Sequence, residues 1–72
     1  MPPVRVIVPS PEEASEPKAE FWVSDELMAV SVLYDGRMHV RIEPRSDGQP
    51  WVIEGASLAL ALDNAARRIA EY

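Results

Sequence analysis

An Asp-Gly pair at Asp35-Gly36 constrains the fold more than any other feature, because it stands between two apolar-rich runs, residues 28–34 and 37–43. Asp-Gly between alternating apolar residues is a strong local signal for a β-hairpin. The two runs are therefore predicted to pair as antiparallel strands, and the rest of the fold must be built around them.

The length of this turn decides which side chains share a face of the hairpin. A two-residue turn at Asp35-Gly36 places Val30 opposite Arg41, so that apolar and charged side chains meet on one face. A three-residue turn that begins at Tyr34, with the glycine in the left-handed conformation of a bulge, shifts the pairing by one residue. The matching of apolar faces favours this three-residue turn. The side chains that then share the core face are Met28, Val30, Val32, Met38, Val40 and Ile42.

Two more segments have strand character. Residues 4–8 carry valines at alternate positions between prolines, which predicts a strand at the edge of a sheet. The run Trp51-Val52-Ile53 follows a second Asp-Gly pair and is predicted as the third strand of a meander. Trp51 and Ile53 are expected to face the same core as Ile42, and the opposite register, with Val52 inward, is the alternative.

Residues 9–20, PSPEEASEPKAE, hold three prolines, four glutamates and one lysine. Such a segment buries too little apolar surface to order itself, so it is predicted to be an acidic, proline-rich linker. The chain is thus divided into an N-terminal strand or arm (1–8), the linker (9–20) and one small β-β-β-α domain (21–72). Phe21-Trp22-Val23 is expected to return the chain to the core or to a contact surface.

The C-terminal segment has the periodicity of a helix. Ser57 is a suitable N-cap after Gly55. Spacings of four, three and four residues then place one apolar stripe along the helix, which predicts that this face packs on the sheet. The stripe consists of Leu58, Leu62, Ala65 and Ile69, and Tyr72 continues it.

One leucine of this helix, Leu60, falls on the opposite, polar side. Ala59, Ala66 and Ala70 form a neighbouring seam of small residues, which lets another helix approach closely. An exposed leucine and good helix formers are also ordinary features of a helix surface. The alternative is a dimer or partner contact at Leu60 and the alanines.

Length and composition set the fold class and its limits. A chain of 72 residues without cysteine holds one small domain, which has no disulfides to support it and buries only about 60% of its unfolded surface. We expect an α+β fold: a three-stranded antiparallel sheet, extended by a fourth N-terminal strand in one version, with one C-terminal helix packed on one face. The small core favours a homodimer.

Several function classes are disfavoured. No apolar segment approaches the length of about 20 residues that a membrane span needs, so we expect a soluble, cytoplasmic protein. A net charge of −5 works against general nucleic-acid binding. No phosphate-binding, dinucleotide-binding or catalytic motif is present, and the glutamates of the linker are not held in a fixed geometry for a metal. We therefore predict no enzyme, no catalytic residues, no cofactor and no metal.

One strand side is basic. Arg37, His39 and Arg41 alternate with apolar residues and are predicted to point outward, with Arg45 continuing the row. His39 lacks a neighbouring nucleophile and an orienting partner, so a solvated histidine is the preferred interpretation over a general base. Charged outward positions also protect an edge strand. The alternative is a charged contact surface, with Trp22 as a further contact.

The segment that begins at Gly55 resembles the helix entry of the HicB-like antitoxins, where a glycine and a Ser or Thr lead into a Leu-x-x-Ala-Leu-x-Asn-Ala helix. The family's acidic pair is replaced here by Ala59 and Leu60. The resemblance covers the C-terminal half and implies a three-stranded sheet backed by one helix, in a domain that blocks a toxin ribonuclease. The matching residues are Gly55, Ser57, Leu58, Ala61, Leu62, Asn64, Ala65 and Ile69.

From these observations we expect a non-enzymatic protein-interaction module, a homodimeric accessory protein of a bacterium or phage. Its contacts would be the exposed sheet face, the Leu60 side of the helix or the segment around Trp22. The alternative is a HicB-like antitoxin that inhibits a ribonuclease or regulates transcription. A third hypothesis, weak nucleic-acid binding by the arginine strand, predicts a steep dependence on salt.

Overall fold

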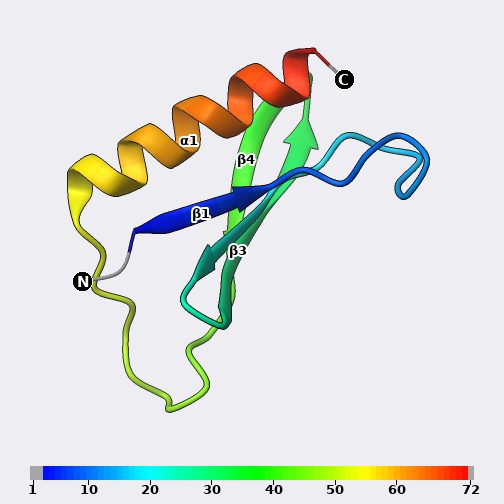
Figure 1. The fold of residues 1–72 in the computed structure, drawn as a ribbon. Coiled ribbons are helices and arrows are strands. Elements are labelled where there is room, and N and C mark those ends of the chain that lie inside the picture. Colours follow the sequence, from blue (N-terminus) through cyan, green and yellow to red (C-terminus); the bar gives the residue numbers. More distant parts are fainter. Residues whose placement is uncertain (1–2, 72) are drawn as a thin grey trace.

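Four antiparallel strands and one helix follow one another in residues 3–71, the part of the chain that this computed structural model describes (Figure 1). The sheet has the order β1-β2-β3-β4, so each strand pairs with its neighbour in sequence. The expected α+β fold is confirmed, in the version with an N-terminal strand at the sheet edge. The elements are β1 (Val4–Ile7), β2 (Glu20–Val23), β3 (Glu26–Tyr34), β4 (Arg37–Ile42) and α1 (Gly55–Ala70).

The turn between β3 and β4 has two residues, so the predicted three-residue bulge is wrong. Tyr34 pairs with Arg37, and both Asp35 (φ 53°) and Gly36 (φ 73°) have positive φ. Positive φ at both central residues defines a type I′ turn, whose twist suits the strands that it joins. Val30 consequently lies opposite Arg41, as the two-residue register requires.

A β-bulge in β3 explains why the apolar pattern was misleading. Phe21 pairs with Ala29 but Trp22 pairs with Leu27, so Met28 is an extra residue in β3. The bulge lets both Met28 and Ala29 be buried, although they are adjacent in sequence. Beyond the bulge the odd-numbered residues face the core. Val30 and Val32, which the apolar pattern predicts in the core, therefore lie on the opposite face.

The third strand of the meander is β2 and not the predicted segment Trp51–Ile53, which has no strand pairing. Trp51 and Ile53 nevertheless pack against the core as expected, and Val52 is exposed. The indole N–H of Trp51 donates to the carbonyl of Glu43 at 2.8 Å. The segment thus returns the chain to the helix without joining the sheet.

The helix starts at Gly55, and the expected N-cap, Ser57, lies within its first turn. The residue in the N-cap position is Glu54, whose side chain makes no capping hydrogen bond. The Ser57 hydroxyl instead accepts a hydrogen bond from the backbone N–H of Val4, at 3.1 Å. A contact with a strand 53 residues away took the place of a local cap.

The core is small, and alanines supply much of it. Phe21 is the one large side chain that is fully buried among the described residues. Ala61 and Ala65 bring the helix against the sheet, and the predicted stripe of Leu58, Leu62 and Ile69 packs around this cluster while half-buried. Tyr72 lies outside the described residues. The remaining buried apolar side chains are Ala19, Val23, Met28 and Ala29.

Residues 43–54 are tied to the sheet by Glu26. Its Oε1 atom accepts a hydrogen bond from the backbone N–H of Ser46 at 2.6 Å. Hydrogen bonds from the side chain and the backbone of Ser46 lower the pKa of the Glu26 carboxyl. The ionised side chain of Glu26 therefore fixes residues 43–54 to the start of β3.

Candidate functional site

The face of the sheet that points away from α1 is the candidate site, and we call it the open face. Side chains of paired residues share a face in an antiparallel sheet. Since Phe21 and Ala29 belong to the core with Ala61 and Ala65, the alternate positions point away from the helix. The open face consists of Arg5, Ile7, Glu20, Trp22, Leu27, Val30, Val32, Tyr34, Arg37, His39 and Arg41.

Apolar and aromatic side chains form the centre of the open face. Trp22, Val30 and Val32 are half-buried, and Tyr34 is 61% exposed. The indole N–H of Trp22 donates to Glu20 Oε1 at 3.2 Å, which fixes the ring on the sheet. Isolated exposed apolar residues are ordinary, but a group on one face of two adjacent central strands indicates a contact surface.

The charges on the open face are mainly positive. Arg5, Arg37 and Arg41 lie on it against two glutamates, Glu20 and, directly after β4, Glu43, in a chain of net charge −5. Arg41 pairs with the adjacent Glu43 at 3.0 Å. Most of the twelve acidic residues of the chain lie off this face, so the open face is suited to an acidic partner.

His39 and Tyr34 form one corner of the open face. Their rings meet edge-on, with centroids 5.1 Å apart. The Nδ1 atom of His39 lies 3.0 Å from the carbonyl oxygen of Arg37, in an exposed position. These contacts orient the histidine as a surface group and supply no carboxylate or nucleophile beside it.

The structure gathers four of the predicted contact residues on this one face: Trp22, Arg37, His39 and Arg41. Arg45 does not continue the row, because its guanidinium lies 5.5 Å from the Trp51 ring and pairs with Asp47. The sequence prediction missed Arg5, Val30, Val32 and Tyr34 as members. The apolar alternation in residues 28–34 could have indicated these members. The bulge at Met28, however, reverses which side chains of that alternation face the core.

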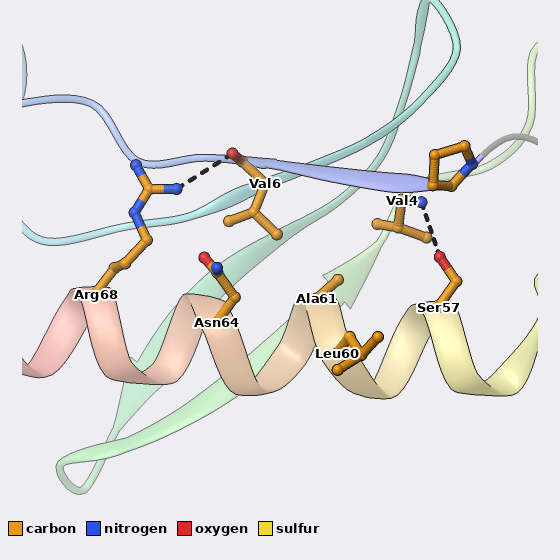
Figure 2. Close-up of a pocket in the computed structure, with 8 residues that line it drawn as sticks. Val4, Val6, Ser57, Leu60, Ala61, Asn64 and Arg68 are labelled. Carbon is orange, nitrogen blue, oxygen red and sulfur yellow. Dashed lines mark hydrogen bonds between the residues drawn. The ribbon is translucent and has the colours of Figure 1, made fainter.

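The other predicted contacts lie on α1, away from the open face. Ala59, Ala66 and Ala70 are exposed, and Leu60 is 71% exposed. Leu60 borders an open groove of about 290 Å³ between the helix and β1. Figure 2 shows this groove, which Ser57 and Arg68 bridge by hydrogen bonds to Val4 and Val6.

Within residues 3–71, no group of three or more His, Asp or Glu side chains is placed to hold a metal ion. In the same part of the chain, no helix combines the length and the apolarity that crossing a bilayer requires.

No known protein family, curated protein or solved structure matches this chain. The resemblance to the HicB-like antitoxins stays a prediction. Function must therefore be inferred from the composition and geometry of the open face.

Proposed function

We propose that this protein is a non-enzymatic interaction module that binds an acidic segment of another protein on its open face. The supporting observation is one surface on which Trp22, Val30, Val32 and Tyr34 form an apolar centre beside three arginines. Aromatic residues and arginine are enriched in protein interfaces, where they contribute much of the binding energy. The net charge of the rest of the chain repels an acidic partner from other surfaces.

The arrangement of charge and apolar area predicts how binding works. The arginines attract an acidic partner and orient it, while the energy comes from burying the Trp22 ring and its valine neighbours. Arg41 is expected to influence mainly the association rate and its salt dependence. Trp22 is expected to influence mainly the dissociation rate.

Photo-crosslinking in the host tests this proposal. A photoreactive phenylalanine analogue at position 32 reports on the open face, and the same analogue at position 66 reports on the exposed side of α1. We expect a protein to be captured from position 32 and not from position 66. The capture should be lost with Trp22→Ala and weakened with Arg41→Glu, and it should persist with Leu60→Glu.

Two outcomes would contradict the proposal. Capture from position 66 alone would move the contact to the helix. Capture of a species from position 32 that nuclease digestion removes would assign the face to nucleic acid, and its binding should then fall steeply with salt.

An antitoxin-like role is the second candidate, because an antiparallel sheet is followed by one helix, as the HicB resemblance implies, although the sheet has four strands where the resemblance implies three. A ribonuclease reading frame beside the gene would support this role. Purified protein added to that ribonuclease should then block RNA cleavage at a one-to-one ratio. Undiminished cleavage would remove this candidate.

A further inference from the structure

The two edges of the sheet differ in how they are protected. At the β1 edge, the Val4 N–H donates to Ser57 Oγ at 3.1 Å, and Arg68 Nη1 donates to the Val6 carbonyl at 3.3 Å. β1 is also the strand that α1 contacts most extensively. An edge that already has an N–H and a carbonyl bonded to a helix is a poor template for another strand. The β1 edge is therefore closed.

The β4 edge is open. Glu43 donates its N–H to the Met28 carbonyl, so the odd-numbered residues of β4 point their backbone groups toward β3. In an antiparallel ladder the residues alternate, and the N–H and C=O groups of Met38, Val40 and Ile42 therefore point away from the sheet. β4 contains no proline and no bulge between Arg37 and Ile42. These three residues form a regular, unpaired strand edge.

Apolar side chains accompany this edge on the core side of the sheet. Met38 and Val40 are only half-buried, and Ile42 is 66% exposed. Between α1 and this end of the sheet lies an apolar cleft of about 330 Å³. The helix covers the β1 side of the core and leaves the β4 side incompletely covered. The residues that line the cleft are Met28, Val40, Ile42, Trp51, Ile53, Leu58 and Leu62.

We propose that a second copy of this chain pairs with the β4 edge, antiparallel and with its two-fold axis at Val40. This interface runs along the β4 edge, where the arginine row of the open face borders it, and it goes beyond the proposed function. In this register Val40 faces its own equivalent, and Met38 faces Ile42 of the second copy. All three outward N–H groups and all three outward carbonyls on each side then have partners.

The charges beside the edge select this register and favour a second copy as the occupant. Arg37 lies opposite Glu43 of the second copy, twice in the dimer, which is a favourable cross-strand pair. His39 lies opposite Arg41 of the second copy, so no two arginines face each other across the axis in this register. The strand is thus complementary to itself in both hydrogen bonding and charge.

The other two-fold registers use the edge less well. An axis at His39 places Arg37 opposite Arg41, and an axis at Arg41 places two copies of Arg41 opposite each other, so both set like charges together. An axis at Met38 places Val40 opposite Gly36, where the chain already turns. An axis at Ile42 places Val40 opposite Pro44, which has no N–H to donate. Only the axis at Val40 pairs Met38, Val40 and Ile42 together.

Charge reversal with complementation tests the interface. Arg37→Glu sets two glutamates opposite each other at both ends of the interface, and Glu43→Arg sets two arginines opposite each other. We expect each variant alone to raise the dimer Kd about 10- to 30-fold in sedimentation equilibrium. An equimolar mixture of the two variants restores both pairs, so a heterodimer should form with nearly the wild-type Kd.

Two controls separate the interface from general charge effects. Arg5→Glu changes the charge of the open face by the same amount at the opposite edge and should leave the Kd unchanged. Hydrogen exchange provides a second measurement in the wild-type protein. Protection of the Met38, Val40 and Ile42 amides should rise with protein concentration, whereas Arg41 should be protected by β3 at every concentration.

A wild-type protein that remains monomeric at millimolar concentration would overturn the proposal. A dimer that is insensitive to both reversals, or a mixture that fails to form a heterodimer, would do the same. Loss of the dimer through Leu60→Glu, with the β4 variants unaffected, would place the interface on the helix instead. None of these results bears on crosslinking from position 32, so the two proposals fail separately.

Discussion

Truncation of Phe21 to alanine should remove much of the stability of this protein. Phe21 is fully buried, and its companions in the core include four alanines. Short side chains cannot extend into the space that the ring leaves, so the cavity stays open and the cost should be about 4 kcal/mol. A 72-residue domain has a total stability of about 4 to 11 kcal/mol. The variant should therefore be partly unfolded or close to it.

Urea and thermal unfolding, followed by circular dichroism at one fixed protein concentration, measure this effect. A loss of about 4 kcal/mol lowers the Tm of a domain of this size by about 16 to 32 °C. Phe21→Leu retains most of the volume and should cost less than about 1.5 kcal/mol. Trp22→Ala is the matched control, since the neighbouring ring lies half-buried on the open face and should cost clearly less than Phe21→Ala.

A cost below about 1 kcal/mol for Phe21→Ala would refute the reasoning, because it would show that the core does not depend on this ring. An equal cost for Trp22→Ala would also refute it. The open face would then contribute as much to folding as the core does.

Three further predictions concern single positions. Ser31→Ala removes the hydroxyl that accepts a hydrogen bond from the Ala19 N–H at 2.7 Å. Because a buried donor then loses its partner, the free energy of unfolding in urea should fall by about 1 to 3 kcal/mol. Ser31→Thr keeps a hydroxyl and should retain most of the stability. Gly36→Ala should lower the free energy of unfolding by about 1 to 2 kcal/mol in the same assay. The φ angle at Gly36 is +73°, and no atom lies within 4 Å of an added Cβ, so the cost comes from backbone strain alone. The pKa of Glu26 is lowered in the folded state by hydrogen bonds from Ser46, so its contribution to stability is complete above the ordinary glutamate pKa of 4.5 and is lost as the pH falls through the folded pKa. The stability difference between wild type and Glu26→Gln, measured by urea unfolding, should therefore shrink at acidic pH, and a constant difference would contradict the assignment.

The sequence predicted the faces of β4 correctly and those of β3 incorrectly, for a physical reason. In β4 every second residue is charged or imidazole, so only one assignment of faces is possible. In residues 28–34 apolar side chains occupy both alternations, and the pattern alone cannot locate the bulge at Met28. Bulges depend on which strand pairs alongside, and that strand, β2, was not recognised.

The strand β2 was missed because it has only four residues and follows a proline-rich segment. Trp51–Ile53 has an equally short apolar run and received the strand assignment instead. Such runs are distinguished by their partners in space and not by their composition. The same limit applies to Ser57, whose partner is the backbone of Val4.

The bonds from Ser57 and Arg68 to β1 join the first element of the described chain to the last one. During synthesis all four strands leave the ribosome before α1 does, and until then the core face around Phe21 has no cover. The helix also has to bond to a strand that emerged about 50 residues earlier. We expect the nascent chain to stay unfolded until α1 is released, and to be a substrate for holding chaperones during that interval.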